Sequence, residues 1–456
     1  MPVVQFTGLA SGIDSASLVD ALIEARETTN QLRRAEIEFI ESETDALEEL
    51  NTKILALSDL VDQFSTLNGG GISKKAESTD TSVATASAGS DAINSSFDLT
   101  VNTIADNATV SIEDSYASLS AFYTTGGDTT LQIDVGGTPI SHTVNITSSV
   151  TTLQDVINDI NSSSTIGSLA VASGVNVGTE SSPDYRIMIT SLNTGTDEGS
   201  LTVTDGAAGT TITTDQATNS EFTISGIAGT ITRQSNTVND VITGVTFQIQ
   251  DTGSATISVS DDSDETAEKM QEILDSYNEV VDFIDENDTV ERVESGQNIA
   301  NVFGSLAKTS IDNDFLTSFR TSLSTATSSN GTSVASMAEL GIKTNRDGTL
   351  EFDVDDFKEA ISSDSVGAGE VIRDFADDLS GISGVLSQFT KFNGFIDIAQ
   401  ESNASEIELL NSEINQKDRS NQKLRETLEL RFSKLESTVS KLQSQESALS
   451  GILAGL

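Results

Sequence analysis

The chain contains no cysteine and no tryptophan, and only one histidine occurs among its 456 residues. The absence of cysteine excludes a disulfide framework, a thiolate nucleophile and a metal site with cysteine ligands. Any Ser-His-Asp site would have to use the single histidine, His142. That residue lies in the alternating run ISHTV, which is typical of a β-strand. We therefore expect His142 to be a strand residue that faces solvent or a neighbouring side chain.

Positive charge is also scarce. The chain has 24 Lys and Arg against 71 Asp and Glu, which gives a formal net charge of −47. From residue 76 to residue 232 the only basic residue is Arg186. Because phosphate groups are bound by clustered Lys and Arg, this composition argues against nucleic acid and against anionic membrane surfaces. A strongly acidic protein stays soluble and resists random association, and it is also compatible with a saline medium.

The chain has no catalytic or nucleotide-binding signature. GxSxG, HExxH, Walker A and GxGxxG sequences are all missing. The run from Asn345 to Gly348 resembles the middle of a calcium loop, but that spacing would place Lys343 and Val354 at ligand positions. Neither side chain can bind calcium as required, so a β-hairpin is favoured. The acidic cluster at 261–265 is interpreted as the charged start of a helix. We expect no catalytic, metal-binding or cofactor-binding residue.

No apolar run approaches the ~18 residues that a membrane-spanning helix needs. The first basic residue is Arg26, and the opening MPVVQFTGLASGID has neither a charged start nor a long apolar core. This opening does not resemble a secretory signal peptide. We expect no membrane insertion and, if the protein leaves the cell, a route without a cleaved signal.

Apolar residues at both ends of the chain repeat at helical spacing. Near the C-terminus five leucines, from Leu428 to Leu456, keep one register of seven residues. A period near 3.5 places an apolar seam on one face of a helix, and such a seam needs a partner helix. The two seams can pair with each other or with neighbouring molecules, and we expect assembly. The predicted assembly seam consists of Ile40, Leu47, Leu50, Ile54, Leu57, Val61, Phe64, Leu424, Leu428, Phe432, Leu435, Val439, Leu442 and Leu449.

The pattern between the ends predicts an α+β, multidomain chain. Asp14 is a candidate cap for a first helix, and a longer helix follows to about residue 67, where Asn68 and three glycines stop it. From 73 to 260, short alternating Thr-, Val- and Ile-rich runs predict strands, with one helix at 153–160. Helices are expected again from 266, around 299–323 and at 370–392. Asp347-Gly348 predicts a hairpin, and Asp353 the cap of a short helix.

These elements suggest terminal segments, a stalk and a head. The terminal coiled-coil segments would be 1–71 and 404–456, and the helical stalk 266–403. The head would comprise an inner β-rich domain, 72–110 with 218–265, and an outer β-rich domain, 111–217. The 456 residues are enough for roughly three domains at ~100–200 residues each.

Several segments together resemble the bacterial flagellar filament cap proteins, the flagellar hook-associated protein 2 family. GLASGIDSASLVDALIEA at 8–25 is similar to the N-terminal signature of that family. FTISGIAGTITRQSNTVNDVITGVTFQI at 222–249 resembles its head motif, and MAELGIKTNRDGTLEFD its C-terminal hairpin. LQIDVGGTPISHTVNI with TLQDVINDINS resembles a small repeat of flagellins and hook-associated proteins, and LRETLELRFSKLESTVSKLQSQESALSGIL resembles the terminal helix. Residues from about 106 to 219 depart most from the family.

The resemblance implies a structural role and not an enzymatic one. It implies export through the flagellum's own channel and a homo-oligomeric ring, commonly a pentamer, at the filament tip. The ring would keep flagellin from escaping and promote its polymerisation during filament elongation. Implied partners are further copies of the chain, flagellin, the hook-filament junction proteins and a cytoplasmic export chaperone. The exposed head could also mediate adhesion.

Two other functions fit parts of the sequence. A secreted acidic surface adhesin without a capping role would explain the β-rich middle and the charge, but not the terminal seams. An extracellular hydrolase with paired carboxylates lacks support, because aromatic residues make up 5% of the chain and tryptophan is absent.

Overall fold

The computed structural model describes residues 14–66, 69–206, 210–295, 298–329 and 333–453. The chain divides into two compact units. Unit 1 combines Met1–Asn68 with Ala267–Leu456, and unit 2 is Gly69–Thr266. The terminal segments and the stalk, which the sequence divides at 71 and 404, therefore share one unit.

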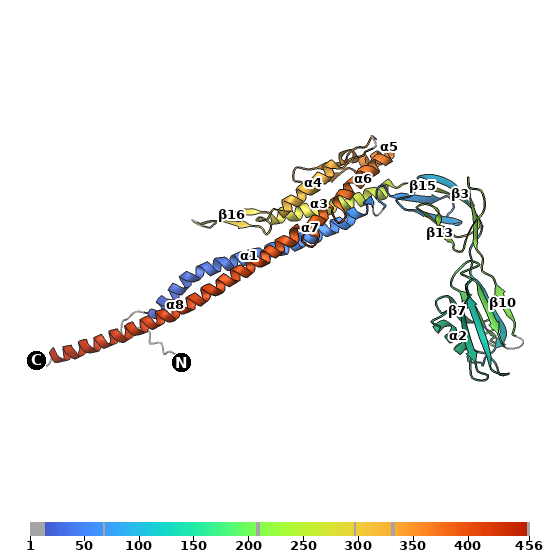
Figure 1. Ribbon diagram of the computed structural model, residues 1–456, viewed down its shortest axis with the longest axis horizontal. Coiled ribbons are helices and arrows are strands. Elements are labelled where there is room, and N and C mark those ends of the chain that lie inside the picture. Colours follow the sequence, from blue (N-terminus) through green and yellow to red (C-terminus); the bar gives the residue numbers. More distant parts are fainter. Residues whose placement is uncertain (1–13, 67–68, 207–209, 296–297, 330–332, 454–456) are drawn as a thin grey trace. The chain divides into compact units, whose positions relative to one another are not determined.

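Unit 1 is mainly helical, and its two longest helices come from opposite ends of the chain. These are α1 (Ser15–Asp62) and α8 (Phe395–Leu453), which lie side by side in Figure 1 (blue and red). Asp14 caps α1, because its carboxylate accepts bonds from the Ser17 N–H and hydroxyl at 3.1 and 2.6 Å. The remaining elements of unit 1 are α3 (Ser263–Asn287), which begins in unit 2, β16 (Val290–Ser295), β17 (Asn298–Phe303), α4 (Ile311–Thr325), β18 (Ile342–Thr344), β19 (Leu350–Phe352), α5 (Val354–Ser363), α6 (Ser365–Leu379) and α7 (Val385–Thr390), with a 3₁₀ turn at Met337–Leu340.

An aromatic cluster holds the helices of unit 1 together. Tyr277 of α3 stacks on Phe319 of α4 with ring centroids 4.2 Å apart, and Phe319 meets the edge of Phe375 of α6 at 5.6 Å. All three rings are buried. Such offset and edge-on pairs add stability beyond the area that they bury.

Unit 2 contains two β cores, called the inner β core and the outer β core. The inner β core combines a five-stranded antiparallel sheet, in the order β1-β15-β3-β11-β12, with a three-stranded sheet, β13-β14-β2. Phe222 and Phe247 meet at 5.7 Å between the two sheets. The strands are β1 (Lys74–Ser78), β2 (Ala84–Ala88), β3 (Ser95–Thr103), β11 (Ser220–Ile224), β12 (Ile231–Arg233), β13 (Thr237–Ile242), β14 (Val245–Ile249) and β15 (Gly253–Asp261).

The outer β core is inserted between β3 and β11. It packs a four-stranded sheet, β10-β4-β8-β7, and a three-stranded sheet, β6-β5-β9, together with one helix, α2. Thr152 and Asp155 form a capping box at the start of α2. The elements are β4 (Thr109–Tyr116), β5 (Thr129–Val135), β6 (Ile140–Ile146), α2 (Leu153–Ser162), β7 (Ala170–Asn176), β8 (Tyr185–Ser191), β9 (Leu201–Asp205) and β10 (Ile212–Asp215).

The predicted strands, the helix at 153–160, the hairpin at Asp347-Gly348 and the Asp353 cap are confirmed. Two predicted boundaries were wrong at the N-terminus. Residues 15–62 form one helix and not two, because no glycine or proline interrupts them. The helix also ends at Asp62 instead of continuing to 67, and residues 67–68 lie outside the described part of the chain.

Two further helix predictions were wrong in unit 1. The helix predicted at 299–323 begins only at Ile311, because β17 pairs with β16 and the Gly304 N–H donates to the Thr289 carbonyl at 2.7 Å. A Cβ at Gly304 would lie 2.2 Å from the Asn287 oxygen, so this close approach requires glycine. The helix predicted at 370–392 is broken between α6 and α7, where Gly381 has a φ of +78°.

Candidate assembly interface

The seven N-terminal seam residues are already covered by their own chain. Their exposed fractions run from 0% to 4%, for Ile40, Leu47, Leu50, Ile54, Leu57, Val61 and Phe64. Helix α1 packs here against α6, α7 and the first part of α8. These side chains form part of the core of unit 1, so they offer no free surface to another molecule.

The C-terminal seam residues behave differently. Leu424, Leu428, Phe432 and Val439 are half-buried, whereas Leu435, Leu442 and Leu449 are 45%, 59% and 63% exposed. The exposed leucines follow one another at intervals of seven residues, so they lie on one face of α8. Together these seven residues are called the C-terminal seam.

The antiparallel register of α1 against α8 shows how far along α8 the described part of α1 covers it. Arg33 pairs with Glu413 at 2.8 Å, and Asp20 pairs with Arg425 at 2.7 Å. Thirteen residues of α1 thus match twelve of α8, as expected for antiparallel helices of equal rise. The start of α1 at Ser15 therefore lies opposite roughly residue 430 of α8. Beyond that point the described part of α1 offers no partner to the C-terminal seam.

Polar residues interrupt the apolar contact between α1 and α8. The fully buried Asn30 side chain donates to the Asp418 carboxylate at 2.6 Å. Asn421 is 3% exposed, and its side-chain amide has no hydrogen-bond partner within the described residues. Sequence reasoning missed both residues. The signal was present for Asn421, because extending the leucine register back by seven residues from Leu428 reaches Asn421, and seven more reach the buried Ile414.

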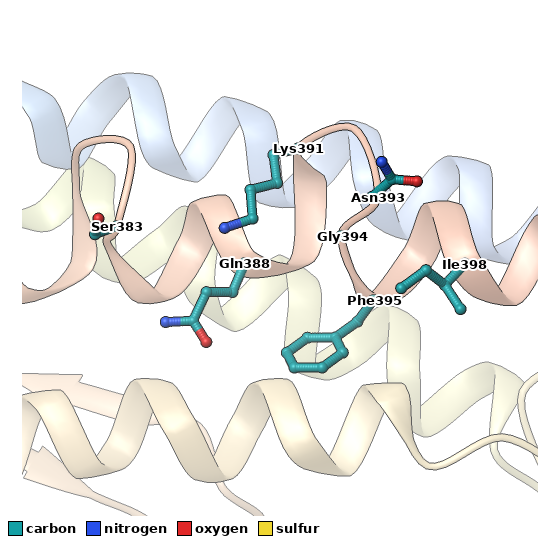
Figure 2. A pocket seen from close by; sticks show the side chains of 7 residues that line it. All are labelled: Ser383, Gln388, Lys391, Asn393, Gly394, Phe395 and Ile398. Atoms are coloured by element: carbon teal, nitrogen blue, oxygen red, sulfur yellow. The ribbon is translucent and has the colours of Figure 1, made fainter.

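A hollow of about 360 Å³ opens where α7 is followed by α8. Figure 2 shows the Gln388 and Phe395 side chains pointing to the same side of the two helices. The hollow is lined by Ser383, Gln388, Lys391, Asn393, Gly394, Phe395 and Ile398. No sequence motif pointed to it.

Models of flagellar hook-associated protein 2 match both ends of the chain. The N-terminal model covers residues 11–108, and the C-terminal model covers residues 217–444. The A-type flagellar hook-associated protein 2 of Pseudomonas aeruginosa is 30% identical over 382 residues, which are 76% of this chain and 75% of the relative. The chain belongs to the flagellar hook-associated protein 2 family.

Other members of the hook-associated protein 2 family agree over greater lengths. The B-type protein of Pseudomonas aeruginosa is 26% identical and covers 98% of both chains. The crystal structure of the flagellar cap protein FliD D1-D2-D3 domains from Escherichia coli superposes with a TM-score of 0.59 at 21% identity, over 80% of this chain and 99% of that one. That likeness supports the fold. Neither family model matches residues 109–216, the segment that contains the outer β core.

The side chains that could have suggested chemistry contact other residues of the chain. His142 lies in β6, with Nδ1 3.2 Å from the Ser163 hydroxyl and Nε2 3.4 Å from Asp159. The Ser163 oxygen also accepts the backbone N–H groups of Thr165 and Ile166, so it holds the turn after α2. These contacts join β6 to the end of α2.

The carboxylates of the acidic clusters also form hydrogen bonds and an ion pair within the chain. Asp347 accepts bonds from the Thr349 N–H and hydroxyl, which close the hairpin and lower the pKa of the Asp347 carboxyl. Asp262 accepts the Glu265 N–H at the start of α3, and Asp261 pairs with Lys74. Across the described residues no three His, Asp or Glu gather as metal ligands. None of the described helices is both long enough and apolar enough to cross a bilayer.

Proposed function

We propose that this protein caps the flagellar filament, acting as a homo-oligomeric ring at the filament tip that retains flagellin and promotes its polymerisation. Membership of the hook-associated protein 2 family supports this role. The ring is a pentamer, and its partners are flagellin, the hook-filament junction proteins and a cytoplasmic export chaperone. The role is structural, and the protein acts at the filament tip.

The observation that carries the proposal is the exposed C-terminal seam. Leu435, Leu442 and Leu449 form an apolar stripe on a part of α8 that no described residue of α1 reaches. Full burial of each leucine would contribute ~1.5–3 kcal/mol, so the stripe favours contact with neighbouring molecules. An adhesin without a capping role gives this stripe no purpose.

The seven N-terminal seam residues, from Ile40 to Phe64, are not part of the proposed contact between copies. Because Ile40 to Phe64 fill the core of unit 1, the proposed seam is restricted to the C-terminal set. The N-terminal seven stabilise the helical unit that carries it.

The test is complementation of a cap-deficient strain with Leu435→Asp combined with Leu442→Asp. Charges on the stripe oppose apolar contact, since burying an unpaired carboxylate is strongly unfavourable. We expect short or absent filaments and flagellin in the medium. The readouts are filament length and flagellin in the supernatant.

The matched control is Ser437→Asp combined with Ser444→Asp, which adds the same charge to exposed positions off the stripe. This control should restore filaments. Normal filaments from the Leu435/Leu442 variant, exported at normal levels, would remove the C-terminal seam from the proposal.

A further inference from the structure

A second apolar surface of unit 1 has no partner within the described residues. Four large side chains in the turns on either side of α7 and in the first turn of α8 are exposed: Ile382 at 90%, Phe392 at 85%, Ile398 at 53% and Phe395 at 50%. Phe395 and Ile398 line the hollow of about 360 Å³ described above (Figure 2), and Ile382 and Phe392 are next in the chain to the lining residues Ser383 and Lys391. We call these four residues and the hollow the 382–398 surface. Clustered exposed apolar residues of this size commonly mark interaction sites.

Aromatic contacts connect this surface to the core of unit 1. The Phe395 ring lies 5.1 Å from the buried Phe389, which meets the edge of buried Phe315 of α4 at 5.5 Å. The turn before α8 is held at Asn393, whose N–H donates to the Asp397 carboxylate at 2.8 Å and whose φ is +57°. The hollow is therefore formed before any partner arrives, which lowers the ordering cost of binding.

The 382–398 surface is also unusual in charge. From residue 380 to residue 398 the chain has one acidic residue, Asp397, and one basic residue, Lys391. Two copies that each carry a net charge of −47 repel one another. Close contact between copies is favoured where the net charge is low, and on this surface the single carboxylate, Asp397, is balanced by Lys391.

We propose that the 382–398 surface binds a second copy of this chain, with Phe392 of one copy entering the hollow of the next. Each copy carries both the projecting ring and the hollow that can receive it. Because the Phe392 side chain and the hollow are different parts of the surface, each copy can contact the next in a head-to-tail manner. Head-to-tail contacts close into a ring of subunits when the rotation between neighbouring copies permits it. The inference rests on the proposed ring at the filament tip and names a contact that helps to form it.

The chain lacks cysteine, so introduced thiols report one contact only. The experiment mixes full-length protein carrying Ser383→Cys, which lines the hollow, with full-length protein carrying Lys391→Cys, next to Phe392. A short bis-maleimide should link the two variants into dimers. The control pairs Ser383→Cys with Ser120→Cys, an exposed serine of the outer β core. Equal yields from the two mixtures would overturn the proposal, as would preferential linkage of Ser383→Cys to added flagellin that carries an introduced surface cysteine.

A second measurement uses Phe392→Ser and, as the matched control, Phe122→Ser, a half-exposed phenylalanine of the outer β core. Thermal melting should be unchanged in both variants. Phe392→Ser should raise the dissociation constant between copies roughly 10- to 100-fold, the range expected for a buried phenyl ring, as measured by sedimentation. An unchanged dissociation constant would overturn the inference.

Complementation separates this inference from the proposed function. Failure of the unmodified chain to restore filaments to a cap-deficient strain would count against capping itself. Restored filaments with Phe392→Ser as effective as the unmodified chain would count against the 382–398 contact alone.

Discussion

The side chain of Asn236 and the backbone of Ala105 exchange two hydrogen bonds, each 2.8 Å long. Asn236 follows β12 of the inner β core, and Ala105 begins the crossing to the outer β core. Beside this pair, the Gln234 side-chain oxygen accepts the Asp197 and Glu198 N–H groups at 3.1 and 2.7 Å. The connection between β12 and β13 therefore adds a third link to the two points where the chain crosses between the cores.

Breaking this third link should make the position of the outer β core relative to the inner β core more variable. Gly195 has a φ of +89°, and a Cβ there would lie 2.6 Å from the Gln234 Cα. Gly195→Ala with Gln234→Ala should separate the loops, at a cost of ~1–3 kcal/mol for the two side-chain bonds. Spin labels at Ser120→Cys and Thr232→Cys should then give a broader distance distribution. Gln132→Ala, an exposed glutamine within the outer β core, serves as control, and an unchanged distribution would show that the two crossings suffice.

The amide hydrogen exchange rates of α8 should change near residue 430. Protection is expected along α1 from Ile40 to Val61, because these side chains are buried. Amides of α8 beyond Phe432 should exchange quickly in dilute monomer, since an isolated helix gains too little from its own hydrogen bonds to stay formed. Strong protection from Leu435 to Leu449 in a proven monomer would contradict this expectation.

Replacing the two buried asparagines should have opposite effects on stability. Asn421→Leu should raise the free energy of unfolding of unit 1 by ~1–3 kcal/mol, because the amide it removes is buried without a partner. Asn30→Leu should lower it, since Asp418 would lose its 2.6 Å donor. Denaturant melts of the full chain measure both. Stabilisation by Asn30→Leu would show that the Asn30–Asp418 bond contributes nothing to stability.

The outer β core should lose stability in alkaline solution. Burial, followed by a hydrogen bond to Asp205, raises the pKa of the Tyr123 hydroxyl, and burial also raises the pKa of Tyr116. In the unfolded chain both titrate near pKa ~10. The folded state keeps them neutral, so its advantage is complete below pH ~10 and falls as pH rises above that value. Because the chain lacks tryptophan, tyrosinate absorbance and melting can be followed cleanly. Tyr123→Phe should be less sensitive to alkali than the unmodified chain, and equal sensitivity would contradict this assignment.

Local patterns in the sequence predicted most individual elements. Alternation located β3, β5 and β6, because one face of each strand is buried and the side-chain period is two. Capping chemistry located the starts of α1 and α5. The residues at 299–303 were assigned to a helix because short apolar runs fit both periods, and pairing with β16 decides between them.

The candidate site was predicted only in part. Heptad spacing identified both apolar seams, since spacing is a property of the chain itself. Spacing could not say which seam is covered, because the cover on α8 depends on where the start of α1 lies against α8. It also left out Asn30 and Asn421, whose burial arises only when the two helices meet.

The sequence by itself determined the acidic charge, the absence of thiol chemistry, the alternation of the β-rich middle and the apolar faces of the terminal helices. Residue type and periodicity are enough for these properties. Only the tertiary structure decided that the N-terminal apolar face belongs to the core of unit 1, that α8 extends past the described start of α1, and that Phe392 is exposed next to residues that line the hollow. Each depends on contacts between residues far apart in the chain, and local spacing carries no information about them.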